Sequence, residues 1–273
     1  NIGNGKKALI EFVSANPTGP LTVGHGRGAI LGDVISNILI WNGYSIEREY
    51  YYNNAGKQME RLGLSVKYRY FELLGKKHEF PEDGYEGQYI IDIAQKLIEE
   101  KGSKIPESQN LSTFIKIAEK NLFKDIKSTL EKINIFFDNY FNEQSLYDTG
   151  MLELVLKKLQ DKGLIYKKDG ATWFRASAAG REHDKVVIKS TGEPTYRLPD
   201  IAYHKNKFER GYDYIIDVLG ADHMDAYPDV LAAIEQLGYN SKKINVLIHQ
   251  FVTLTKNGEP VKMSTRKAQY ITL

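Results

Sequence analysis

The sequence predicts an α/β protein that is built on a parallel β-sheet and interrupted by a long, mostly helical insertion. Short apolar strands alternate with helices at both ends of the chain, a pattern typical of βαβ units. The middle instead shows long helical periodicity with many Lys and Glu residues. We therefore expect residues 1–62 to form the first half of the sheet domain, 63–184 a helical connective insertion, and 185–273 the second half.

The N-terminal part predicts one βαβ unit. Residues 8–13 are a short, mostly apolar strand, and residues 46–52 alternate as a second strand. Between them, apolar side chains recur at helical spacing over residues 30–39 until Gly43, which is a typical helix stop. Strand, helix and strand in this order indicate neighbouring parallel strands.

The middle of the chain predicts helices followed by a hairpin. Residues 114–137 and 151–159 have helical patterns, and a tight turn is expected at Lys168-Asp169-Gly170-Ala171. The tyrosine-rich segments 50–52 and 68–71 are expected in the core or on strand faces, with base stacking on RNA as the alternative.

The C-terminal part returns to the alternation of strands and helices. Strands are predicted at 185–188, 214–219 and 244–249, and helices at 199–209 and 228–237. The continuous apolar run at 214–219 is of the kind that parallel sheets bury on both faces.

Composition limits the class of protein. The 273 residues are 42% hydrophobic and 26% charged with a net charge of +2, so charge alone favours no partner. The absence of cysteine excludes disulfides and thiolate metal sites and fits a reducing cytoplasm. No apolar run approaches the ~20 residues that cross a bilayer. We expect a cytoplasmic, monomeric protein away from membranes, and a piece of a longer chain, because Asn1 is not methionine.

A Gly/Pro-rich loop at 14–28 carries the first candidate site. It follows the first strand, and ligands bind beyond the carboxyl ends of strands in open parallel sheets. The helix that follows directs its free N–H groups at such a ligand, and His25 and Arg27 add donors. Glycines without side chains let a phosphate or adenine approach the backbone: Gly24, Gly26 and Gly28.

A second loop, at 261–267, is basic and bears hydroxyl groups. Together the two loops predict two sides of a polyphosphate site, and hence an enzyme that uses ATP. We expect His25 and Lys262 to converge across one cleft.

Both loops match known signatures. Residues 17–25 resemble the first signature of class I aminoacyl-tRNA synthetases, usually His-Ile-Gly-His, with Thr22 in place of the first histidine. Residues 262–266 resemble the second, Lys-Met-Ser-Lys-Ser, with Thr265 in place of the inner lysine; Arg266 or Lys267 would supply that charge. Within the class, the chain is most similar to arginyl-tRNA synthetases, at segments 11–20, 53–56, 196–203 and 262–267.

The resemblance implies a Rossmann-like (HUP-type) nucleotide-binding domain that activates arginine with ATP and Mg²⁺, the Mg²⁺ arriving with ATP rather than in a protein metal site. Arginyl-adenylate would then pass its arginyl group to the 3′ end of tRNA, so arginine, ATP and the tRNA acceptor end are the expected partners. In this family activation requires bound tRNA, and the N-terminal and anticodon-binding domains of the family are expected to be absent here.

The resemblance also assigns residues to ATP. His25 would donate to the α-phosphate, Lys262 would clamp the β- and γ-phosphates, and the Thr22 hydroxyl would assist; these three are the expected catalytic residues. Asp222 would accept from a ribose hydroxyl beside Gly220. The expected ATP-binding set is Gly24, His25, Arg27, Gly28, Gly220, Asp222, Lys262, Met263 and Ser264.

A second set is expected to bind arginine. Asp200 and Tyr196, one helical turn apart, would hold the guanidinium group. The α-amino and carboxyl groups would meet Ser14, Asn16 and His223, and Glu11 is a further candidate near the pocket. Two alternatives remain: another adenylyl-transferring enzyme of the same nucleotide fold, or a non-catalytic synthetase-like binding module. The second alternative should have lost His25 or Lys262, and the sequence retains both.

Overall fold

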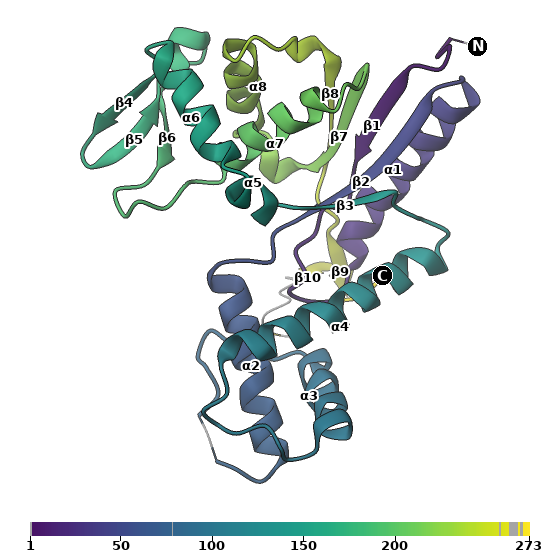
Figure 1. The fold of residues 1–273 in the computed structure, drawn as a ribbon. Coiled ribbons are helices and arrows are strands. Elements are labelled where there is room, and N and C mark those ends of the chain that lie inside the picture. The colour runs from purple at the N-terminus through teal and green to yellow at the C-terminus, as the bar shows by residue number, and fades with distance from the viewer. Residues whose placement is uncertain (1, 78, 257, 262–266, 268–269) are drawn as a thin grey trace. The chain divides into compact units, whose positions relative to one another are not determined.

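The computed structural model describes residues 2–77, 79–256, 258–261, 267 and 270–273 (Figure 1). The chain divides into two compact units. The first comprises Asn1–Ser14, Ile30–Tyr51 and Phe137–Phe251, and the second comprises Ala15–Ala29, Tyr52–Phe136 and Val252–Leu273.

A five-stranded sheet forms the centre of the first unit. Its order is β3-β2-β1-β7-β8, with β1 (Lys7–Glu11), β2 (Ser45–Tyr52), β3 (Asn139–Asn142), β7 (Tyr214–Gly220) and β8 (Ile244–His249). β1 pairs in parallel with β2 and β7, and β7 pairs in parallel with β8. The predicted α/β class with a parallel sheet is confirmed.

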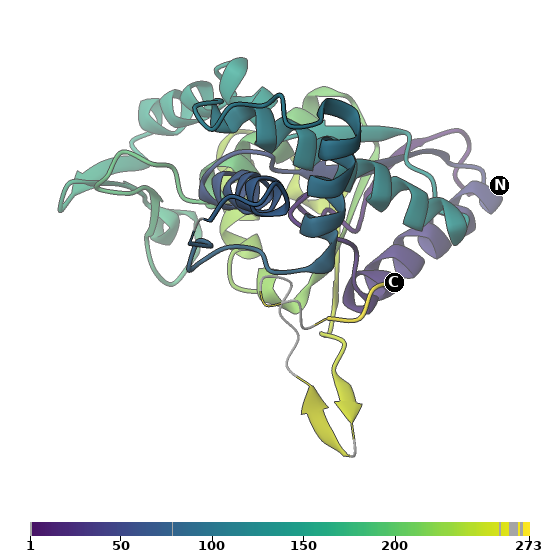
Figure 2. The ribbon, with the colours of Figure 1, turned by 90° about the horizontal axis from the view of Figure 1, so that it is seen from below.

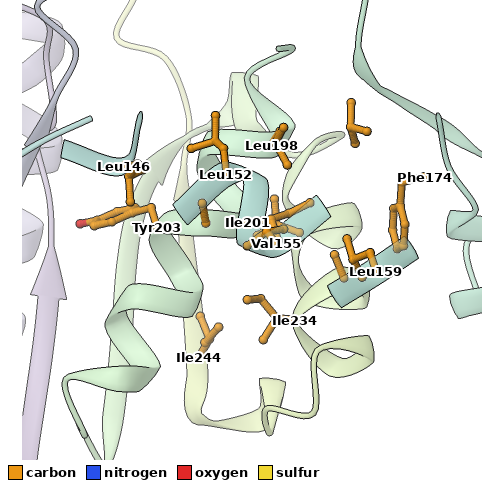
Figure 3. Close-up of a cluster of buried hydrophobic side chains, with 14 of the residues drawn as sticks. Leu146, Leu152, Val155, Leu159, Phe174, Leu198, Ile201, Tyr203, Ile234 and Ile244 are labelled. Atoms are coloured by element: carbon orange, nitrogen blue, oxygen red, sulfur yellow. The ribbon is translucent and has the colours of Figure 1, made fainter. Parts of the chain in front are cut away.

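Helices bury the apolar residues of this sheet. They are α5 (Gln144–Asp148), α6 (Met151–Asp161), α7 (Arg197–Glu209), α8 (Tyr227–Gln236) and α1 (Val23–Trp41), which starts in the second unit and continues in the first. The main core joins Leu9 and Ile215 of the sheet to Val155, Ile201 and Ile234 of α6, α7 and α8 (Figure 3). Leucine, isoleucine and valine from separate parts of the chain thus form one buried cluster.

A small antiparallel sheet of β4 (Ile165–Lys168), β5 (Ala171–Phe174) and β6 (Lys185–Ile188) completes the first unit. The predicted hairpin is confirmed: Asp169 and Gly170 adopt φ angles of 51° and 74°, as tight hairpin turns require. β6 is a strand as predicted, but it pairs with β5 rather than joining the parallel alternation. Apolar periodicity identifies a strand without encoding its partner.

The second unit is mostly helical. α2 (Lys57–Leu73), α3 (Gln88–Lys101) and α4 (Leu111–Lys132) share a core, and β9 (Leu254–Lys256) and β10 (Glu259–Val261) form an antiparallel hairpin, drawn in yellow in Figure 2. α4 ends at Lys132 rather than at residue 137, because Asn134 turns to a φ of 60°. Tyr70 and Phe71 are buried in this core, as the favoured interpretation predicted.

β1 ends at Glu11, two residues before the predicted end. Val13 and Ser14 have φ angles of 67° and 46°, in the left-handed region that a β-branched valine rarely adopts. Such backbone strain is concentrated at functional sites, and here it opens the loop that carries the first signature.

Three acidic residues lie side by side across the first unit's sheet. Glu11 of β1 is in register with Glu49 of β2 on one side and with Asp217 of β7 on the other. All three are buried. Burying three ionised carboxylates is costly unless each is paired.

α7 and its C-cap residue, Arg210, supply the compensating cations. Lys207 donates to Glu11 Oε2 at 2.5 Å and to Asp217 Oδ1 at 2.6 Å. Arg210 binds both oxygens of Glu49 at 2.5 and 2.7 Å. His204 lies 2.9 Å from Asp217 Oδ2 through Nε2 and 2.7 Å from the Asp200 carbonyl through Nδ1. Both partners offer oxygen acceptors, so each ring nitrogen of His204 faces a hydrogen-bond acceptor.

The pairing governs ionisation in this layer. Burial alone would raise the pKa of Asp217, but the charges of Lys207 and His204 hold it well below its usual value. Burial alone would lower the pKa of Lys207, and Asp217 and Glu11 instead raise it. Lys207 therefore stays charged at neutral pH.

We predict that Lys207→Met lowers the free energy of unfolding by about 3–5 kcal/mol at pH 7, because Glu11 and Asp217 lose their shared cation. The deficit should shrink at acidic pH, where the two carboxyls take up protons. Urea unfolding at two pH values measures both effects. Lys205→Met is the matched control, because Lys205 is equally buried but pairs with Glu209, which is 42% exposed. Equal losses in the two variants would contradict the assigned role.

Candidate active site

Ser14 is held in place by the end of β1. Its hydroxyl donates to Glu11 Oε1 at 2.9 Å and accepts from the Tyr51 N–H at 3.1 Å. The other Glu11 oxygen takes Lys207. Glu11 therefore orients the Ser14 hydroxyl. The charge of Glu11 is already compensated by Lys207.

Asp200 has no such compensation. It lies partly buried in the first turn of α7, and no described residue forms a hydrogen bond or ion pair with its carboxylate. Burial, with smaller contributions from Glu11 and Glu143, raises its pKa to about 6 against the opposing charges of His204 and His223. An unpaired carboxylate of this kind is a binding group for a cation.

Glu143 and two tyrosines lie near Asp200, and sequence reasoning missed all three. Tyr51 donates to Glu143 Oε2 at 2.6 Å, and Tyr147 lies 3.4 Å from Oε1. Burial and the charges of Glu143 and Asp200 raise the pKa of Tyr51 and bring that of Tyr147 to about 12, so both phenols stay protonated. The available signal was an acidic residue directly after a strand at 139–142.

Tyr196 directly precedes α7. The residue is 65% exposed, and the guanidinium carbon of Arg197 lies 5.3 Å from the ring centroid. Tyr196 and Asp200 are one turn apart, as predicted, with the Asp200 N–H bonded to the Tyr196 carbonyl at 3.2 Å.

Gly220, Asp222 and His223 follow the carboxyl end of β7. A Cβ atom at residue 220 would lie 2.5 Å from Asp222 Oδ1, so the glycine makes room for that carboxylate. Asp222 and His223 are largely exposed, with 3.8 Å between Oδ2 and Nε2. These polar groups are therefore open to a ligand at this strand end.

In the second unit, the first signature fixes the state of His25. The Thr22 N–H donates to His25 Nδ1 at 2.9 Å, and the Thr22 hydroxyl lies 3.1 Å from the same nitrogen. Because Nδ1 accepts, the proton of the neutral ring is on Nε2. Burial lowers the pKa of His25, which keeps the ring neutral at pH 7. His25 is therefore an Nε2–H donor.

The segment that follows the second signature is bonded to the first. The Val23 N–H donates to the Ile271 carbonyl at 3.0 Å, and the Leu273 N–H donates to the Leu21 carbonyl at 2.9 Å. Thr22 and Thr272 pair as a single antiparallel β-bridge. A Cβ at Gly26 would lie 2.6 Å from Leu273 Cδ1, so this glycine serves packing. The predicted residues Lys262, Met263 and Ser264 lie outside the described residues.

The remaining predicted residues of the second unit lie on the same loop and helix. Asn16 accepts from the Asn53 N–H at 2.9 Å and donates to Gln58 Oε1 at 3.3 Å. Gly24, Arg27 and Gly28 belong to the first turns of α1. Among the residues that the structure describes, no three His, Asp or Glu side chains group to hold a metal ion. None of the described helices is long and apolar enough to span a membrane.

Comparisons with known proteins identify the family of the chain. The family model described as tRNA synthetases class I (R), catalytic domain, matches residues 1–273. The arginine–tRNA ligase of Desulfotalea psychrophila is 57% identical over 272 residues, covering 100% of this chain and 49% of its own. That of Salinibacter ruber is 52% identical over 287 residues, covering 99% and 51%. The chain thus spans about half the length of these relatives.

A solved structure from Campylobacter jejuni, assigned as an arginyl-tRNA synthetase, superposes with a TM-score of 0.87 at 38% identity. The match covers 99% of this chain and 60% of that one.

We predict that Asp200→Asn raises the free energy of unfolding by about 1–2 kcal/mol at pH 7.5. The carboxyl has a raised pKa in the folded state, so its ionisation costs stability above pH ~6, and the cost disappears below pH ~4, where folded and unfolded states are both protonated. Urea unfolding at pH 7.5 and pH 4 measures the difference. Asp222→Asn, at an exposed carboxylate, should change stability by less than about 0.5 kcal/mol at either pH. Destabilisation by Asp200→Asn at pH 7.5 would show that Asp200 has a partner within the protein.

Proposed function

Because the chain belongs to the class I tRNA synthetase (R) catalytic-domain family, we propose that it joins arginine to AMP and passes the arginyl group to the 3′ end of tRNA. The observation that carries this proposal is the unpaired Asp200 carboxylate near Glu143, framed by Tyr51 and Tyr147. A site with surplus negative charge and aromatic walls suits a planar cation.

Arginine fits this site better than lysine does. A guanidinium group presents donors in a rigid fork that can meet two carboxylates at once, whereas an ammonium is a point charge. We propose that Asp200 and Glu143 bind the guanidinium and that Tyr196 covers it. Ser14, Asn16 and His223 would bind the α-amino and carboxyl groups, and Glu11 would act by orienting Ser14.

Activation is a substitution at the α-phosphorus. The arginine carboxylate oxygen forms the new O–P bond while the bond to pyrophosphate breaks, and negative charge grows on the phosphate oxygens. We propose that His25 Nε2–H donates to those oxygens. Thr22 would act by holding the ring, since its N–H and hydroxyl both face Nδ1.

The other predicted ATP contacts stand as proposals. Lys262 would clamp the leaving pyrophosphate, with Met263, Ser264 and Arg27 near the nucleotide, and Gly24, Gly28 and Gly220 would leave room beside Asp222. The described residues include no cage of three acidic or histidine ligands. Mg²⁺ therefore fits as an ion held by the ATP phosphates, where it would neutralise their charge.

We also retain the domain boundaries 1–62, 63–184 and 185–273, a monomeric state and a cytoplasmic location as proposals. Cysteine-free composition supports the location.

We predict that Glu143→Gln and Asp200→Asn each weaken arginine binding about 10- to 100-fold, because each removes a charge-assisted hydrogen bond. Arginine affinity of the unaltered chain should also fall below pH ~6, where Asp200 takes up a proton. Calorimetric titration with arginine, lysine and glutamine measures selectivity, and pyrophosphate exchange with and without tRNA measures activation.

Glu193→Gln is the matched control, since Glu193 pairs with Lys189 on the surface, and it should leave arginine affinity unchanged. Tighter binding of lysine or glutamine than of arginine would sink the proposed substrate. Arginine binding without any pyrophosphate exchange, even with tRNA, would indicate a non-catalytic module.

A further inference from the structure

A cluster of surplus positive charge surrounds Asp229. This aspartate lies in the first turn of α8 and is 1% exposed. Arg181 Nε lies 3.2 Å from one carboxylate oxygen, and Arg197 Nε and Lys185 Nζ lie 3.0 and 3.8 Å from the other. Three cations thus face one anion, which leaves a formal surplus of two positive charges.

Asp229 does not need three cations. Its position in the first turn of α8 places it near the positive end of the helix dipole, which favours a negative charge. One arginine would complete the compensation. Arg197 is moreover the first residue of α7, where the helix terminus adds further positive potential.

Arg181 and Arg197 contact Asp229 without using their Nη atoms. Each approaches Asp229 through Nε, and within the described part of the chain no acceptor binds their Nη atoms. The side chains of Arg181, Lys185 and Arg197 are 36%, 28% and 18% exposed, so the cluster reaches solvent. Unused Nη groups beside a lysine are suited to phosphate oxygens.

The two acidic residues beside this cluster in the sequence direct their carboxylates elsewhere. Glu182 lies 3.4 Å from His183, and Asp184 accepts hydrogen bonds from Ser177 at 2.6 Å and from Tyr166 at 2.8 Å. The guanidinium carbon of Arg197 lies 5.3 Å from the centroid of the Tyr196 ring, so one face of this ring belongs to the cation cluster. Arginine and lysine side chains are the residues that most often contact nucleic-acid phosphates.

We propose that Arg181, Lys185 and Arg197 bind a phosphodiester of the RNA strand whose 3′ end accepts the arginyl group. The proposal rests on the proposed function, because Arg197 lies next to Tyr196 and less than one helical turn from Asp200. Asp229 acts as the positioning residue that holds the two guanidinium groups with their Nη atoms outward.

The test measures binding of a fluorescent RNA hairpin, with a tRNA acceptor stem and a single-stranded CCA end, to the 273-residue chain between about 50 and 300 mM NaCl. Arg181→Gln and Lys185→Gln, which leave Arg197 to neutralise Asp229, should each weaken binding about two- to fivefold. Each should also lower the slope of log affinity against log salt by about one. Arg181→Lys should restore most of the slope, and Lys189→Gln, at a surface lysine paired with Glu193, should retain the unaltered slope.

Several outcomes separate the possibilities. Unchanged slopes in both variants, or no salt-dependent binding by the unaltered chain, would overturn the site. Weakened binding of ATP or inorganic pyrophosphate with unchanged RNA binding would also overturn it, since the phosphate would then belong to the nucleotide. Arginine titration checks that the variants remain folded. The expected slope changes in a chain that binds no arginine would support the phosphate site while contradicting the proposed function.

Discussion

The first unit depends on a row of buried, paired charges across three strands of its sheet. Glu49, Glu11 and Asp217 stand in register on three adjacent strands. Their partners are His204 and Lys207 of α7 and Arg210, the C-cap residue of that helix. Positions 204, 207 and 210 share one helix face, since they recur at intervals of three. A buried charge on either the sheet or the helix would be costly without its partner, so these ion pairs fix the position of α7 on the sheet.

This row of charges is connected to two of the proposed ligand-binding residues through single hydrogen bonds. Glu11 orients Ser14, and His204 donates to the Asp200 carbonyl. The Asp200 carboxylate has no cation paired with it, whereas Asp229 faces more cations than its single charge requires. Opposite surplus charges therefore lie close together at the beginning of α7. Asp200 is an anion without a paired cation, and Arg197, three residues earlier, belongs to the group of cations around Asp229. A cationic ligand would neutralise the first of these charges, and an anionic ligand would neutralise the second.

Local sequence patterns were sufficient for much of the fold. The apolar runs at β1, β2, β7 and β8 and the Asp169-Gly170 turn were predictable, because burial and turn chemistry act on neighbouring residues. An acidic residue directly after a strand was too weak a signal to identify Glu143, because its position beside Asp200 depends on a contact with Tyr51, which is distant in the chain. The register of Glu11 with Glu49 and Asp217, and the pairing of β6 with β5, likewise arise from long-range contacts that periodicity does not contain.

The departure of the first signature from its usual form also has a physical account. A histidine is usual where Thr22 stands, yet the contact that fixes the tautomer of His25 comes from the main-chain N–H of residue 22, which any residue except proline supplies. The Thr22 hydroxyl adds a second contact to the same ring nitrogen. The backbone on either side of that N–H is in turn bonded to Ile271 and Leu273. The segment 271–273, which follows the second signature in the sequence, therefore holds the peptide that orients His25.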